Sequence, residues 1–260
     1  MIDPLMFIAL LPAVVLVVYI CRKDRTDKEP PALIAKLLGY GVLSCLPAIV
    51  VELILSAIIE RLNVRNVYLG YFLEAFVVAG LTEETCKFLF LRTTWRNPAF
   101  DYQFDAIVYA VMVALGFAAF ENVKYVYSYG FATGIVRAVT AVPGHAIFGV
   151  FMGYFYGYAK LSDYWGRDDD RKAYLALSVV VPVLMHGCYD FLAFTQESDS
   201  RFTLLFYAYL VALYVFGIRR VNRSSRDDRR VTRETVFDYF HRMQYPMPPQ
   251  YRDRNDDFWR

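Results

Sequence analysis

Long apolar stretches, separated by short polar segments, follow one another through most of the chain. Seven of them have the roughly 20 apolar residues that a helix needs to cross a hydrocarbon core of about 30 Å. They cover residues 2–20, 33–59, 68–91, 104–127, 133–159, 173–194 and 202–219. No stretch alternates with the period of two typical of a membrane β-barrel, and lipid offers no partner to an open backbone. The pattern predicts an all-α, polytopic integral membrane helix bundle of about seven transmembrane helices.

The composition agrees with a membrane protein, because 57% of the residues are apolar and 17% are aromatic. Residues 2–20 have no basic segment before them and no small-residue cleavage site after them, so we interpret them as a retained first span. The four cysteines form no CxxC pair, and we expect free thiols. The partner expected from this composition is the lipid bilayer, with no nucleic acid.

The placement of basic residues predicts the orientation. Ten lysines and arginines lie in the short loops on one side: Arg22, Lys23, Arg25, Lys28, Arg92, Arg96, Lys160, Arg167, Arg171 and Lys172. The opposite loops carry four: Arg61, Arg65, Lys124 and Arg201. The positive-inside rule then places the N-terminus outside and the C-terminus in the cytoplasm. We expect a transmembrane domain over residues 1–219 and a basic, mixed-charge cytoplasmic tail over 220–260, which either contacts anionic lipid or only sets the topology of the last span.

Charged groups inside the third span are the first sign of chemistry. Glu83, Glu84 and Lys87 share one helical turn, so the lysine reaches either carboxylate. A charge at this depth costs at least about 2.5 kcal/mol. Two carboxylates against one ammonium leave a negative charge that suits a general base, which would activate a water. The alternative is an ion pair that docks helices.

Three later spans carry further polar groups. Glu121 and Asn122 lie near the far end of the fourth span. His145 in the fifth span shares a helix face with glycines at intervals of four, which predicts close packing against another helix. In the sixth span His186 and Asp190 are four residues apart, so the carboxylate can orient the imidazole. By the predicted spans these groups lie at different depths, so a shared site requires a tilted or kinked bundle.

The motifs EETCK, GFAAFEN, PGHAIFG and HGCYD, in that order on successive spans, resemble the PrsW family of membrane proteases. The resemblance covers about residues 70–195 and extends to the CAAX prenyl endopeptidases and the CPBP membrane proteins. It implies an intramembrane endopeptidase that cleaves membrane-anchored proteins, with a single-pass regulator as one substrate class. Implied catalytic residues are Glu83 or Glu84 as the base, with His145 and His186 binding the water or the oxyanion; supporting residues are Lys87, Glu121, Asn122 and Asp190.

Other interpretations stay open at this point. A divalent metal such as zinc could be required, held by His145, His186, Glu83 and Glu121, although the chain has no HExxH motif; the reaction could equally need no cofactor. A transporter or channel would use the same intramembrane glutamates and histidines for protons or cations. A cysteine protease using Cys86 or Cys188, or an inactive scaffold, are further alternatives.

Overall fold

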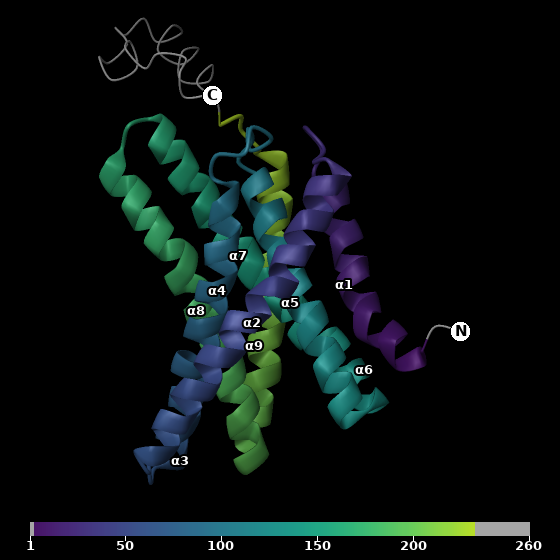
Figure 1. The fold of residues 1–260 in the computed structure, drawn as a ribbon, viewed down its shortest axis with the longest axis vertical. Helices are drawn as coiled ribbons and strands as arrows, with labels where there is room; N and C mark the ends of the chain where they lie inside the picture. The colour runs from purple at the N-terminus through teal and green to yellow at the C-terminus, as the bar shows by residue number, and fades with distance from the viewer. Residues whose placement is uncertain (1–2, 232–260) are drawn as a thin grey trace, which may run out of the picture.

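A computed structural model describes residues 3–231, and apart from one isolated bridge between Tyr102 and Arg230 the ordered elements in this range are helices. In chain order they are α1 (Pro4–Lys23), α2 (Pro31–Arg61), α3 (Val67–Phe72), the π-helix η1 (Leu73–Leu81), α4 (Thr82–Leu91), the 3-10 helix η2 (Arg92–Thr94), α5 (Asp105–Tyr129), α6 (Phe131–Val139), α7 (Ala141–Tyr164), α8 (Asp168–Ser198) and α9 (Arg201–Arg226). Figure 1 shows the long helices running side by side. The predicted helical membrane bundle is confirmed.

Six helical segments of the described chain are long and apolar enough to cross a membrane. The remaining predicted span, the third (68–91), is made of α3, η1 and α4, which follow one another without a break. Its middle part is π-helical, a form that occurs mostly as short insertions near functional sites. The π-helix ends directly before Thr82, so the irregular turns lie next to Glu83 and Glu84.

The fifth predicted span, 133–159, is not a single helix as expected. It is broken at Thr140 into α6 and α7, because the backbone there leaves the helical region, with φ −123° and ψ −73°. His145 therefore lies in the second turn of α7, close to the end of α5 that carries Glu121, and not halfway along a continuous span. This break brings together groups that the predicted spans placed at different depths.

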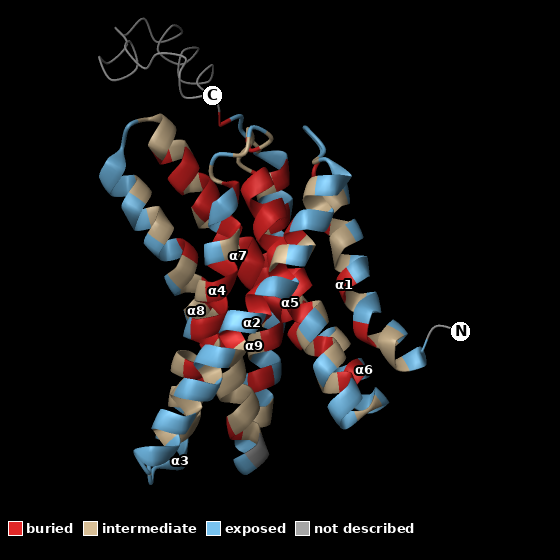
Figure 2. Ribbon diagram, in the orientation of Figure 1, coloured by how far each residue is buried: buried red, intermediate tan, exposed pale blue. Residues whose placement is uncertain are grey.

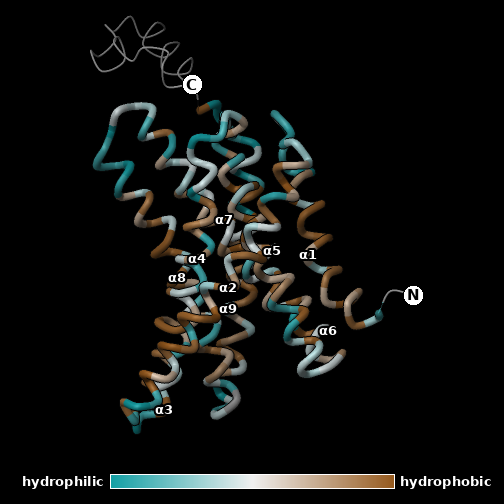
Figure 3. The backbone as a smooth tube through the Cα atoms, viewed as in Figure 1, coloured by the Kyte–Doolittle hydropathy of each residue, from teal (hydrophilic) through white to brown (hydrophobic). Residues whose placement is uncertain are grey.

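Helix α5 is the centre of the bundle. It is buried along most of its length and packs against α1, α2 and α7 (Figure 2). Glycines allow this packing, since a Cβ on Gly153 of α7 would overlap the carbonyl oxygen of Ala106, as the glycine spacing predicted. By contrast α1, α2 and α9 expose many large apolar side chains, a surface suited to lipid. Figure 3 colours the chain by hydropathy, and much of these helices is hydrophobic.

One end of the bundle gathers the C-terminal ends of α1, α7 and α9 and the first residues of α2, α5 and α8 (Figure 1). The loops at this end include those that carry the ten basic residues, so the predicted cytoplasmic face would be this one. The predicted tail of 220–260 begins within α9, which continues to Arg226, and residues 232–260 lie outside the described part of the chain.

Candidate active site

The first turn of α4 positions the two adjacent glutamates. Lys87 Nζ lies 3.1 Å from Glu83 Oε2 and 2.8 Å from Glu84 Oε1, so one ammonium bridges both carboxylates, as the spacing predicted. All three side chains are buried. The π-helical turns before Thr82 present this charged turn toward α7 and α8, from which the two histidines come.

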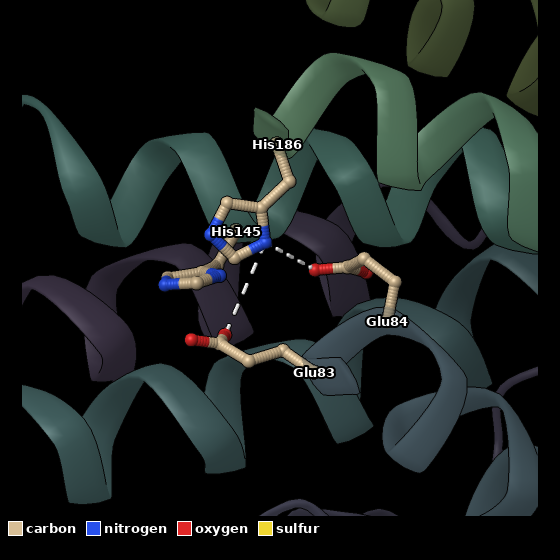
Figure 4. A group of neighbouring side chains, drawn as sticks. All are labelled: Glu83, Glu84, His145 and His186. Atoms are coloured by element: carbon tan, nitrogen blue, oxygen red, sulfur yellow. Dashed lines mark hydrogen bonds and ion pairs between the residues drawn. The ribbon is translucent and has the colours of Figure 1, made fainter. Parts of the chain in front are cut away.

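His186 on α8 lies between two carboxylates. Its Nδ1 is 2.9 Å from Glu84 Oε1 and 3.9 Å from Glu83 Oε2, the two contacts drawn in Figure 4. Its Nε2 is 3.2 Å from Asp190 Oδ2, one turn further along α8. Asp190 therefore orients the ring, a common arrangement in which a carboxylate fixes the outer nitrogen of a functional histidine.

His145 on α7 is held in the same way. Its Nε2 lies 2.9 Å from Glu121 Oε2, and its Nδ1 lies 3.1 Å from Lys87 Nζ. The ammonium can only donate, so Nδ1 accepts and Nε2 carries the proton that it donates to Glu121. The rings of His145 and His186 are nearly perpendicular, with centroids 5.1 Å apart. Both histidines thus point Nδ1 at the charged turn of α4 and Nε2 at a carboxylate that orients them.

Arg137 on α6 completes this network and was not predicted. Its Nη2 lies 2.8 Å from Glu121 Oε2, and its Nε donates to Asn122 Oδ1 at 3.0 Å. Asn122 in turn donates to the carbonyl of Ala9 on α1 at 2.8 Å. The sequence did contain a signal, because Arg137 is a charged residue inside a predicted span and such a residue requires a partner.

The predicted site residues therefore form one connected group. It contains Glu83, Glu84, Lys87, Glu121, Asn122, His145, His186 and Asp190. Asp105 lies elsewhere, at the opposite end of α5, where its carboxylate accepts backbone hydrogen bonds from Asp101 and Tyr102. It is the first residue of α5, a position where the helix dipole favours a carboxylate.

A cavity of about 600 Å³ adjoins the group. It is lined by Glu83, both histidines, Glu121 and Asp190, whereas Glu84 does not reach it. Two further carboxylates, which were not predicted, line the same cavity: Glu52 on α2 and Glu74 on η1. A volume of this size is typical of ligand sites, and its lining combines these charged groups with many apolar side chains.

The centre of the group fits a divalent metal in part. One ligand atom each from Glu83, Glu84, His145 and His186 lies within 4.8 Å of the others. Glu84 Oε2 is buried without a hydrogen-bond partner in the described structure, as a free ligand atom would be. Nitrogen and carboxylate donors in this number suit zinc. The converging set differs from the predicted one, because it contains Glu84 where we expected Glu121.

The comparison with known proteins agrees with the motifs. Residues 29–218, which include all four motifs, match the family model described as PrsW family intramembrane metalloprotease. The chain belongs to this family. Two relatives, each named Protease PrsW, are 34% identical (Bacillus subtilis strain 168; 82% of this chain and 92% of the relative) and 35% identical (Oceanobacillus iheyensis; 83% and 94%). No solved structure matches the chain.

Membership of the PrsW family makes the chain a membrane-embedded protease, which confirms the resemblance that the four motifs indicated. It favours the protease over the transporter or channel that the same intramembrane glutamates and histidines would also have suited. The family model is described as a metalloprotease, which favours a metal-dependent reaction over one without a cofactor.

Proposed function

We propose that the chain hydrolyses a peptide bond of a membrane-anchored protein at the cavity, with Glu83 as the general base. The supporting observation is the unequal position of the two glutamates. Glu83 lines the cavity, whereas Glu84 has 0% of its surface exposed and binds Lys87 and His186. A base must reach the water whose proton it takes, so Glu83 fits the role that the sequence left open between the two.

The metal would be held by Glu84 and by Nδ1 of His145 and His186. One carboxylate and two imidazoles form a ligand set that catalytic zinc sites use, and each imidazole already has its orienting carboxylate, Glu121 or Asp190. When bound, such a metal polarises the scissile carbonyl and makes a water more nucleophilic. Lys87 shares His145 Nδ1, so its ammonium has to move aside for a metal at that nitrogen.

The protein residues then divide the proton transfers and the charge. Glu83 accepts a proton from the attacking water and passes it to the departing amine, which is the usual double role of a general base. Lys87, which bridges the glutamates, supplies a positive charge beside the reacting groups. The two histidines stay in place through their carboxylate partners, so little reorganisation is needed during the reaction.

A substrate in the bilayer is supported by the walls of the cavity. Leu53 of α2, Val136 of α6 and Tyr207 of α9 line it and are also among the exposed large apolar side chains. The cavity therefore borders the surface that faces lipid. A transmembrane substrate segment must unwind locally to be cut, because helical amides are hydrogen-bonded. A single-pass regulatory protein, the substrate class that the resemblance to the PrsW family implies, is compatible with a cavity that opens toward lipid.

Cleavage of a panel of single-pass proteins in liposomes tests the proposal. We expect Glu83→Gln to lower the cleavage rate by about 10²- to 10⁴-fold, with an unchanged melting temperature. Glu60→Gln, at the exposed end of α2, is the matched control and should cleave like the wild type. Cleavage should also stop after dialysis against a chelator and return with zinc.

If Glu83→Gln cleaves normally while Glu84→Gln does not, the assignment of the base is wrong. If the wild type cuts nothing but conducts ions, the proposed reaction is wrong.

A further inference from the structure

A second cavity lies at the end of the bundle where α5 begins and where α7 and α9 end. Its volume is about 220 Å³, and its walls come from the start of α5, the C-terminal half of α7 and the end of α9. The polar and charged side chains that line it are Gln103, Tyr154, Tyr158, Arg220, Arg223, Ser224, Asp227 and Arg229. It shares no residue with the cavity of the candidate active site.

The charges around this cavity are not balanced. Three arginines line it, Arg220, Arg223 and Arg229, but only one carboxylate, that of Asp227. Asp227 already has two partners: it lies 3.5 Å from Arg223 and 3.4 Å from Arg226, and Arg226 is not part of the lining. Within residues 3–231, neither Arg220 nor Arg229 has a carboxylate at ion-pair distance. The Arg220 guanidinium instead lies over the ring of Tyr154, 3.9 Å from its centroid. Among the described residues, no carboxylate therefore competes with an anion for these two guanidiniums.

The chemistry of the lining fits a phosphate group. Guanidiniums pair with phosphate oxygens through two parallel N–H donors, and the fork geometry is suited to this contact. Ser224 and the two tyrosines add hydroxyl donors around the same space. The two free oxygens of a phosphodiester point in different tetrahedral directions and can each accept from a separate guanidinium, whereas a planar carboxylate is matched by one guanidinium fork.

The position of the cavity on α9 relates it to lipid. Phe216 and Ile218, four and two residues before Arg220, have exposed fractions of 61% and 51%. The helix thus changes, within one turn, from an exposed apolar surface to arginines, as a helix does where it passes from the hydrocarbon into the headgroup layer. Tyr154 and Tyr158 of α7 lie at the same level, where tyrosine is common.

We propose that this cavity binds the phosphate of an anionic phospholipid headgroup, held by Arg220 and Arg229. Basic pockets between transmembrane helices are known to take such headgroups. The chemistry that the site recognises is a phosphate ester, so a soluble phosphate is the other source of the same group. The exposed apolar turn before Arg220 favours the lipid, since it would contact the acyl chains of a bound molecule. This site is separate from the proposed peptide hydrolysis and does not depend on it.

Lipid retention by the purified, delipidated full-length chain tests the proposal. The protein in detergent is given equal amounts of phosphatidylglycerol and phosphatidylcholine, and the bound lipid is measured by native mass spectrometry. We expect the wild type to prefer phosphatidylglycerol and Arg220→Gln with Arg229→Gln to lower that preference by roughly tenfold or more, given the contribution of each basic residue near anionic lipid. The matched control is Arg25→Gln with Arg219→Gln, which removes two charges at the same end outside the cavity and should retain the preference.

The single variant Arg229→Gln is measured as well. The Arg229 side chain is exposed, so its loss should leave the fold intact even if the double variant does not fold. We expect it to lose part of the preference. In a separate measurement, inorganic phosphate is added to the delipidated protein as the soluble source of the same group, and the change in thermal stability is recorded. An equal loss in the control variant overturns the proposal, because the attraction is then general to this face. Stabilisation by inorganic phosphate without any lipid preference overturns the lipid assignment in favour of a soluble phosphate.

Discussion

Arg137 acts on the site through another residue. It binds Glu121 at 2.8 Å, and the same Glu121 oxygen lies 2.9 Å from Nε2 of His145. Arg137 therefore fixes the carboxylate that fixes the imidazole. We expect Arg137→Gln to lower kcat for peptide cleavage by about 10- to 100-fold, as loss of an orienting partner does in other sites, with KM nearly unchanged. Steady-state cleavage of a model substrate in liposomes measures both parameters.

The variant Arg137→Lys separates charge from geometry. Lysine restores the positive charge but not the planar fork that contacts Glu121 and Asn122 together, so we expect only partial recovery of kcat. Arg201→Gln is the matched control, since that arginine is exposed and pairs only with Asp199 in the described structure. A change in KM with an unchanged kcat would contradict the positioning role and indicate contact with the substrate.

The residues of the site could be predicted where they share a helical turn. The spacing of Glu83, Glu84 and Lys87, and of His186 and Asp190, requires these contacts in any helix. The contacts between helices could not be derived in the same way, because no periodicity tells which carboxylate meets which imidazole. Arg137 was missed for a different reason, since a hydropathy window averages one charge over many apolar neighbours.

At the scale of the helices, the break at Thr140 had a signal in the sequence. Pro143 is the third residue of α7, where the backbone N–H has no partner within the helix, so proline is tolerated at no cost in hydrogen bonds. In a continuous helix over 133–159 the same proline would remove a hydrogen bond and clash with the preceding turn. Hydropathy alone gives the length of an apolar stretch and does not show where it bends.

The packing of α2 against α5 depends on Gly41. A Cβ on Gly41 would overlap the carbonyl oxygen of Val113, whereas a Cβ on Gly39, two residues earlier, would have no atom within 4 Å. We expect Gly41→Ala to lower the unfolding free energy by about 1 to 3 kcal/mol, the range for overpacking. Gly39→Ala is the matched control and should be neutral or slightly stabilising, because alanine favours a helix. Thermal melting in detergent compares the two variants, and equal melting temperatures would show that α2 is free to move away.

At the scale of the whole molecule, the residues directly after α9, 227–231, which we call the C-terminal segment, close the end of the bundle where α9 ends. Val231 N donates to the carbonyl of Asp101, Gln103 N donates to that of Arg229, and Asp228 accepts a hydrogen bond from Phe104 N. This segment lies near acidic groups at the turn after α1, since the charge of Asp228 acts on Asp24. Asp24 is 3% exposed, and Glu29 accepts a hydrogen bond from Tyr109 at 2.8 Å. The end of the bundle thus contains carboxyl groups that the fold removes from water.

These carboxyl groups make the stability of the bundle depend on pH. Burial, with the charge of Asp228 nearby, raises the pKa of Asp24 from 3.8 to about 6, and burial raises the pKa of Glu29 from 4.5 to about 7. Between the ordinary and the raised pKa the folded protein binds more protons than the unfolded chain, so stability falls as pH increases through this window and the loss is complete above about pH 7.

We expect the melting temperature in detergent to decrease from pH 4.5 to 7.5. Asp24→Asn should flatten part of this slope and raise the melting temperature at pH 7.5, whereas Asp169→Asn, which removes a fully exposed carboxylate at the start of α8, should leave the slope unchanged. If the wild type and Asp24→Asn keep the same slope, Asp24 ionises as freely in the folded protein as in the unfolded chain, and the C-terminal segment does not shield it from water.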